Sequence, residues 1–238
     1  LGVMSYRHPW CAGALLTFMA PNPFSLRLIR QADVVLAIGL RPGAANLDPL
    51  LSNAPDEFIF IGFNDDPVPQ EGPAISCVAD PKLALQELVE RLEPFPRIPD
   101  AHLLAEIESV QGAALRAVER AMEPYRDKAP LHFGLALEEL ARHLTRDAMV
   151  LGDIGSHGQW AAGFLLPLGA ENYFAVGSWG GMGYALKGAI GAKLACPDRP
   201  VVGITGDGSF LMSSADFATA VRTRLHIVYV VLNDGCHG

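Results

Sequence analysis

The amino-acid sequence predicts an α/β fold with two doubly wound parallel-sheet domains. Three observations lead to this prediction: short, continuous apolar runs, amphipathic segments that alternate with them, and a proline-rich break between two such stretches. Continuous apolar runs rich in β-branched residues are typical of parallel strands that are covered on both faces. Strand patterns that alternate with helix patterns indicate a layered α/β architecture.

The first stretch, residues 1–95, contains two predicted buried strands and one predicted helix. The strands are "DVVLAIG" at Asp33–Gly39 and "FIFIGF" at Phe58–Phe63, and the helix is "PKLALQELVERL" at Pro81–Leu92. A proline suits the first turn of a helix because its missing N–H would have no partner there. These elements predict one α/β domain over residues 1–95.

Three prolines between residues 94 and 99 then predict a stiff linker. Asp100 is a predicted N-cap, because its short side chain can accept hydrogen bonds from the first free N–H groups of a helix. The helix that follows extends to about Tyr125. Residues 96–129 are therefore predicted to be a linker and a connecting helix.

Residues 130–238 return to the alternating pattern and predict a second α/β domain. The predicted strands lie at Ala148–Gly155, Tyr173–Val176, Pro200–Thr205 and Ile227–Leu232. The predicted helices lie at His132–Leu144, Gly183–Ala195 and Ser213–Val221.

The amino-acid composition indicates a globular protein and argues against nucleic-acid-binding and membrane proteins. Half of the 238 residues are hydrophobic and 18% are charged, which indicates a globular protein. The net charge of -8 argues against a nucleic-acid partner, which requires a basic surface. The sequence shows neither an apolar stretch of membrane-spanning length nor a signal peptide, and its four cysteines form no C-x-x-C pair. We therefore expect a cytoplasmic protein without a membrane partner.

Polar residues follow two predicted strands at the points where they end. Asp207 comes directly after one strand, and Asn233 follows the next strand along the chain. Ligands of open parallel sheets bind beyond these carboxyl ends, so the two side-chain oxygens could share one small cation, and oxygen ligands suit magnesium. Gly208 and Ser209 follow with backbone N–H groups and a hydroxyl that favour an anion. The pattern predicts a site for magnesium and a diphosphate.

Alternatives remain open at this point. Gly206-Asp207-Gly208 alone could be a simple turn, and its pairing with Asn233 favours the metal site. No dinucleotide-binding, P-loop or nucleophile-elbow motif occurs in the sequence. A nicotinamide- or flavin-binding domain would account for residues 30–92 but not for the pair of strand ends.

Three segments carry a resemblance to a known family. "IGAKLACPDRPVVGITGDGS" at Ile190–Ser209, followed by "VLND", resembles the signature of thiamine diphosphate enzymes of the acetolactate synthase, pyruvate oxidase and pyruvate decarboxylase group. "DIGSHGQWAAGF" at Asp153–Phe164 and "GSWGGMGYALKGAIGAKLA" at Gly177–Ala195 are similar to acetolactate synthase large subunits. The resemblance covers residues 130–238 as the diphosphate-binding domain, and a weaker one covers the central domain.

The resemblance implies a role for each matching residue. Asp207, the Asn233 side chain and the Gly235 carbonyl would bind Mg²⁺. The Gly180 carbonyl and the Met182 side chain would take part in catalysis by holding the aminopyrimidine and bending the cofactor, which brings its reacting groups together. The residues implied to bind thiamine diphosphate are Ser156, His157, Gly180, Met182, Gly206, Asp207, Gly208, Ser209, Asn233 and Gly235.

The implied activity is decarboxylation of a 2-oxo acid with transfer of the acyl-anion fragment to a second carbonyl, as in acetolactate synthase. Simple 2-oxo acid decarboxylase or lyase chemistry and a non-catalytic regulatory relative are the alternatives. Some members of the family bind FAD near an arginine at the position of Arg41, so FAD stays open as a further cofactor. In the family, a pyrimidine-binding domain supplies the activating glutamate across a subunit interface. Because nothing before residue 130 resembles that domain, we expect the chain alone to be inactive and the whole protein to be a homodimer or homotetramer. The sequence also starts within the central domain and stops just after a predicted strand, so we expect both domains to be incomplete.

Overall fold

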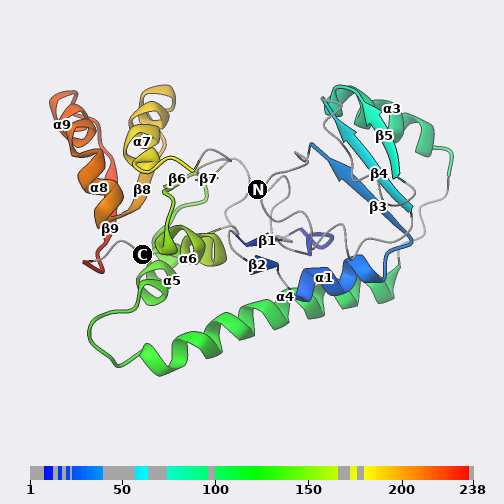
Figure 1. Cartoon of the computed structure of the whole chain (residues 1–238), viewed down its shortest axis with the longest axis horizontal. Coiled ribbons are helices and arrows are strands. Elements are labelled where there is room, and N and C mark those ends of the chain that lie inside the picture. The colour runs from blue at the N-terminus through cyan, green and yellow to red at the C-terminus, as the bar shows by residue number, and fades with distance from the viewer. Residues whose placement is uncertain are drawn as a thin grey trace. The chain divides into compact units, whose positions relative to one another are not determined.

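The structure is a computed structural model, and it describes residues 8–12, 16–17, 20–21, 23–39, 57–63, 74–95, 100–165, 172–175 and 180–235 (Figure 1). The chain divides into two compact units, one formed by residues 12–111 and the other by residues 1–11 and 112–238. Arg41 and its FAD prediction lie outside the described residues.

The unit of residues 12–111 is built on a parallel sheet in the order β3-β4-β5. Ala37, Phe58 and Phe60 form its buried cluster. The Asp80 carboxylate caps α3 by accepting hydrogen bonds from the next residues' N–H groups, at 2.8 Å for Lys82. The elements are β1 (Leu16–Thr17), β2 (Ala20–Pro21), α1 (Pro23–Arg30), β3 (Val34–Ile38), β4 (Glu57–Gly62), β5 (Ala74–Val78) and α3 (Pro81–Leu92).

The long connecting helix is present as α4 (Ala101–Met122), followed by the 3₁₀ turn η1 (Glu123–Tyr125). The Asp100 carboxylate accepts hydrogen bonds from the backbone N–H groups of His102 and Leu103 at 2.9 and 3.0 Å. These two bonds confirm the predicted N-cap. The boundary between the two compact units falls inside this helix.

The second unit contains a four-stranded parallel sheet in the order β7-β6-β8-β9. This order reverses direction once, since the chain goes from β6 outward to β7 and then returns past β6 to β8 and β9. The reversal lies between β6 and β8. The strands are β6 (Met149–Gly152), β7 (Tyr173–Ala175), β8 (Val201–Gly206) and β9 (Val228–Leu232).

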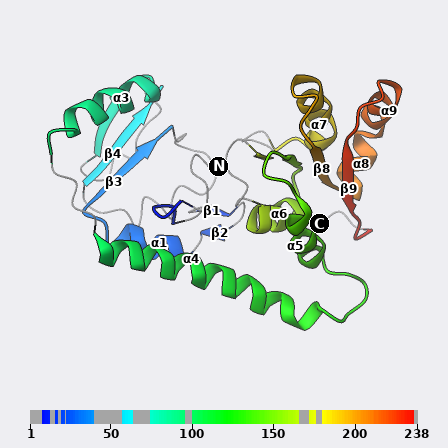
Figure 2. The same ribbon diagram turned by 180° about the vertical axis from the view of Figure 1, so that it is seen from behind.

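Helices cover both faces of this sheet (Figures 1 and 2). Right-handed crossovers require α6 and α7 to lie on opposite faces, because the connections they make run in opposite directions across the sheet. Met149, Leu151 and Val201 pack against Ala185 and Ala189 of α7. The helices are α5 (Phe133–His143), α6 (Ser156–Leu165), α7 (Tyr184–Ala195), α8 (Asp207–Met212) and α9 (Ser214–Arg222).

The predicted α/β class with two parallel sheets is confirmed, and β8 and β9 are adjacent as the site prediction requires. Three helices, α1, α6 and α8, and the strand β5 were not predicted. Helices α6 and α8 begin in the glycine-containing segments after β6 and β8, which read as turns. No helix within the described ranges is long and apolar enough to cross a membrane.

Candidate cofactor site

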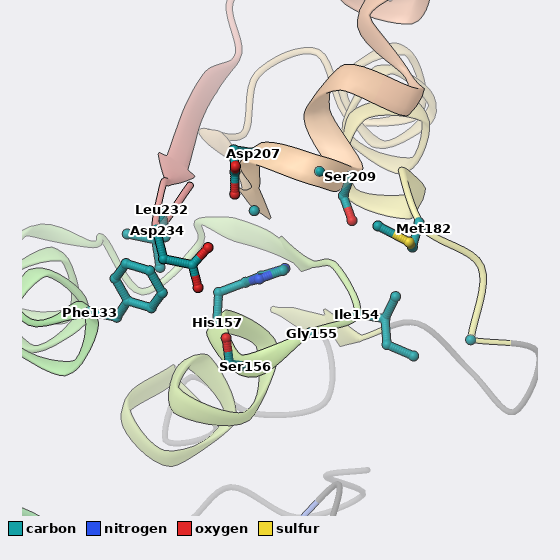
Figure 3. Close-up of a pocket in the computed structure, with 13 residues that line it drawn as sticks. Phe133, Ile154, Gly155, Ser156, His157, Met182, Asp207, Ser209, Leu232 and Asp234 are labelled. Carbon is teal, nitrogen blue, oxygen red and sulfur yellow. The ribbon is translucent and has the colours of Figure 1, made fainter. Parts of the chain in front are cut away.

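A pocket of about 250 Å³ opens where the strand order reverses. The segments that follow β6 and β8 form most of its wall, and the end of β9 closes one side. Open α/β sheets bind ligands at this position because the adjoining loops diverge to opposite faces. The lining residues are Phe133, Ile154, Gly155, Ser156, His157, Gly180, Met182, Gly206, Asp207, Gly208, Ser209, Leu232 and Asp234 (Figure 3).

The His157 imidazole is held between two glycines. Only 6% of His157 is exposed. A Cβ on Gly206 would lie 2.9 Å from both Cε1 and Nδ1 of the ring, and a Cβ on Gly155 would lie 2.6 Å from Cε1. Gly155 also has a φ of +134°, a conformation that L side chains rarely adopt. The ring therefore occupies space that exists only because both neighbours lack side chains.

Burial lowers the pKa of His157, and the nearby charges of Asp153, Asp234 and Asp207 oppose this effect only in part. The charged imidazolium is disfavoured because burial removes its hydration. The ring is consequently neutral at neutral pH. It can then offer one N–H donor and one acceptor to a ligand.

Two buried polar atoms of the pocket wall have no hydrogen-bond partner among the described residues. They are Nε2 of His157 and the hydroxyl oxygen of Ser209, whose exposed fraction is 1%. Buried polar groups without partners are rare in folded proteins, because each costs about 1–3 kcal/mol. A bound ligand with several acceptor oxygens, such as a diphosphate, would satisfy both groups.

One end of the pocket is acidic. Asp207 is the first residue of α8, and the Asp234 carboxylate points into the pocket beside His157 (Figure 3). Asn233 does not line the pocket, and its Oδ1 accepts a hydrogen bond from the Gly235 N–H at 2.9 Å. Side chains alternate along an extended segment, so Asp234 shares the pocket side with Leu232 while Asn233 faces away.

The other end of the pocket is apolar. Met182 and Ile154 lie there, across from the end that holds Phe133 and Asp234 (Figure 3). Gly180 has a φ of +62°, and a Cβ on it would lie 3.0 Å from Cδ1 of Ile154. The unpartnered groups of Ser209 and His157 and this apolar end together suit a ligand that carries both acceptor oxygens and an organic ring.

Of the residues predicted for the site, eight line the pocket: Ser156, His157, Gly180, Met182, Gly206, Asp207, Gly208 and Ser209. Asn233 and Gly235 do not line it, so their roles stay predictions. Sequence reasoning did not name Phe133, Ile154, Gly155, Leu232 or Asp234 as site residues. For Asp234 a signal existed, since it lies two residues after the apolar end of a strand. The described residues contain no cluster of three His, Cys, Asp or Glu side chains that could hold a metal.

The fold and the pocket define an α/β cofactor-binding domain with its site at the switch point of a parallel sheet. Residues 153–238 match the family described as Thiamine pyrophosphate enzyme, C-terminal TPP binding domain. Residues 153–238 therefore belong to this cofactor-binding domain family, and they include every lining residue of the pocket except Phe133.

Known relatives agree with this assignment. The catabolic acetolactate synthase of Raoultella terrigena is 30% identical over 222 residues, which are 87% of this chain and 37% of the relative. The sulfoacetaldehyde acetyltransferase of Castellaniella defragrans is 27% identical over 231 residues, 88% of this chain and 39% of the relative. Acetolactate synthase isozyme 1 large subunit of Escherichia coli (strain K12) is 26% identical over 242 residues, 100% of this chain and 41% of the relative. The chain thus spans about two fifths of the length of these curated relatives.

Proposed function

We propose that this chain is the cofactor-binding part of a thiamine diphosphate- and Mg²⁺-dependent enzyme that decarboxylates a 2-oxo acid and transfers the acyl fragment to a second carbonyl. The observation that carries the proposal is the switch-point pocket, in which unpartnered Ser209 and His157 atoms lie beside Asp207. The family match over the same segment supports the identity of the cofactor. When bound, thiamine diphosphate supplies the electron sink for decarboxylation.

The residues of the pocket fit this cofactor in two parts. The Ser209 hydroxyl and the backbone N–H groups at the start of α8 suit the phosphate oxygens, and neutral His157 suits the same group through Nε2. Met182 and Ile154 suit the organic rings and keep water away from them. Gly180, adjoining Met182, offers its carbonyl as an acceptor for the aminopyrimidine.

The charge of the pocket supports a divalent cation. Its wall contains two carboxylates, Asp207 and Asp234, and no Lys or Arg among the described lining residues. A diphosphate alone would be repelled by these carboxylates, and a cation between the two groups removes the repulsion. We propose Asp207 and Asp234 as the side-chain ligands of Mg²⁺, in preference to the predicted Asn233, since the Asn233 oxygen already accepts the Gly235 N–H.

Three variants test the metal ligands by calorimetric titration of Mg²⁺ in the presence of thiamine diphosphate. We expect Asp207→Asn and Asp234→Asn to weaken Mg²⁺ binding by at least about tenfold, because each removes a charge from the cation's surroundings. Asn233→Ala is the matched control and should change binding by less than about threefold. A strong loss in Asn233→Ala with normal binding in Asp234→Asn would restore the ligand set predicted from the sequence.

The reaction is tested on the complete protein supplied with pyruvate, thiamine diphosphate and Mg²⁺. We expect carbon dioxide and acetolactate to form together. Acetaldehyde in place of acetolactate would assign simple decarboxylase chemistry. Carbon dioxide no higher than in a cofactor-free control would exclude pyruvate as the donor.

A second candidate is acetyl transfer that starts from sulfoacetaldehyde. A sulfoacetaldehyde acetyltransferase of Alcaligenes xylosoxydans xylosoxydans is 30% identical over 253 residues, as similar as the acetolactate synthase of Raoultella. Incubation with sulfoacetaldehyde, thiamine diphosphate, Mg²⁺ and an acetyl acceptor such as inorganic phosphate separates the two candidates, because loss of sulfite from sulfoacetaldehyde would leave an acetyl group for the acceptor. Formation of an acetylated product there, with none of the pyruvate products, would favour the acetyltransferase.

We propose that the protein acts in the cytoplasm as a homodimer or homotetramer, with a neighbouring subunit supplying the activating glutamate. Leu211 and Met212 of α8 and Val221 of α9 are 71%, 69% and 63% exposed. Exposed apolar residues are common at protein interfaces, and α8 begins with the pocket residues Asp207–Ser209. Light scattering should give at least twice the monomer mass, and Leu211→Glu should reduce it.

A further inference from the structure

Asp153 is buried beside the pocket, and its carboxylate accepts four hydrogen bonds, although the family comparison and the sequence prediction assign it no role. It is 2% exposed and follows directly after β6. Its backbone N–H donates to the Ile204 carbonyl at 2.9 Å, which extends the pairing of β6 with β8. The position of the carboxylate is therefore fixed by the sheet itself.

The carboxylate joins three separate segments of the chain. Oδ1 accepts the N–H groups of Ile154 at 2.9 Å and Gly183 at 3.1 Å. Oδ2 accepts the Thr205 hydroxyl at 3.0 Å and the Ala185 N–H at 3.4 Å. A buried carboxylate is tolerated only with such compensation, and the first N–H groups of α7 add the favourable end of a helix dipole.

Two of these bonds hold the turn that presents Met182. Gly183 and Ala185 lie directly after Met182, at the start of α7. The turn has little other freedom: Gly183 has a φ of +81°, and a Cβ on it would lie 1.8 Å from the Ser213 hydroxyl. On its opposite side, the Ile154 side chain packs against Gly180.

We propose that Asp153 is a positioning residue that fixes the Gly180–Gly183 turn against the ends of β6 and β8. This sets the apolar end of the pocket, with Met182, at a constant place relative to the phosphate-facing end at Asp207–Ser209. The part of the proposal that concerns cofactor binding rests on the proposed function. The contact between the carboxylate and the turn does not.

The first test measures amide hydrogen exchange of residues 180–186 in the complete protein without ligands. Asp153→Asn keeps one acceptor oxygen and replaces the other by a donor that opposes the Ala185 N–H. We expect it to raise exchange in this segment by about tenfold or more, and Asp153→Ala to raise it further. Thr205→Val is the matched control, because it removes a buried hydrogen bond to the same carboxylate and none to the turn. It should change exchange of residues 180–186 by less than about threefold.

The second test compares cofactor affinity with thermal stability. Asp153→Asn should bind thiamine diphosphate about tenfold more weakly than Thr205→Val, once the affinity of each variant is corrected for its loss of melting temperature. If Asp153→Asn and Thr205→Val change exchange and affinity equally, Asp153 only stabilises the fold in general, and the proposal is overturned. Raised exchange with wild-type affinity would overturn its cofactor part. Failure of the wild-type protein to bind thiamine diphosphate would overturn the proposed function, while the exchange result would still decide the contact.

Discussion

Gly206→Ala probes the space that His157 occupies. Gly206 has φ −89° and ψ 166°, an extended conformation that alanine adopts without strain, so any cost comes from the new methyl group. That methyl would lie 2.9 Å from two atoms of the imidazole, closer than real Cβ contacts allow. The ring cannot move toward Gly155, because it already fills the space that a side chain on Gly155 would occupy. Overpacking of this kind costs about 1–3 kcal/mol.

Urea unfolding of four proteins measures this cost: wild type, Gly206→Ala, His157→Ala and the double variant. We expect Gly206→Ala to lower the unfolding free energy by about 1–3 kcal/mol in the wild type and by less than about 0.5 kcal/mol once His157 is alanine. Gly191→Ala is the control, because Gly191 lies at an exposed position of α7 where a Cβ would meet nothing within 4 Å, and this change should stabilise by about 0.5–1 kcal/mol. A cost that persists in the His157→Ala background would refute the steric argument.

Three further predictions concern pH and single hydrogen bonds. Burial lowers the pKa of His157, so the contribution of this residue to stability is complete above the unfolded pKa of about 6.5 and is lost as the pH falls below that value. Unfolding free energies measured from pH 8 to 5 in EDTA should show this loss of stability. The loss should be smaller in His157→Gln. Asp100→Ala should cost about 1 kcal/mol by removing the cap of α4, with faster amide exchange in its first turn and unchanged exchange in α7. Tyr229→Phe should cost about 1 kcal/mol, because it removes the hydroxyl that donates to the Leu186 carbonyl at 3.0 Å. Burial and Asp216 raise the pKa of Tyr229 to about 12, so the wild type should lose stability as the pH rises from about 10 to 12. An equally steep loss of unfolding free energy with pH in Tyr229→Phe would contradict this.

All parallel strands except β5 were predicted from the sequence, because their signal is local. Val201–Thr205 and Phe58–Ile61 are continuous apolar runs, and such runs are stable only when both faces are covered. Helices α6 and α8 were not predictable in this way, because their first residues are suited to the pocket that they line and do not show a helical sequence pattern. Ser156–Gly158 and Asp207–Ser209 are small or polar and lack a helical apolar period, and their helical state depends on the sheet edge above which they begin.

The sequence argument placed the site at the ends of β8 and β9, and the pocket lies at the end of β8 with β9 at its side. The side-chain direction at the end of β9 was not predicted. Asn233 and Asp234 are adjacent, and spacing along the sequence does not say which of them faces β8. The buried end of β9 decides it, because Leu232 and Asp234 share one side of the extended segment. Asp153 was hidden for a different reason: its partners Gly183 and Thr205 lie far along the chain and meet it only in the folded sheet.

The strand order of the second unit also bears on how this protein gains its pocket during folding. The wall is made of segments after β6, β8 and β9, and pairing β6 with β8 requires a chain excursion through α6, β7 and α7. Contacts of such long sequence separation form late and slowly. A chain without the β6–β8 pairing also lacks the pocket wall that the segments after these two strands form. A cofactor that is present during synthesis would therefore stabilise the domain only after β6 and β8 have paired, because it binds the folded pocket and shifts the equilibrium toward it.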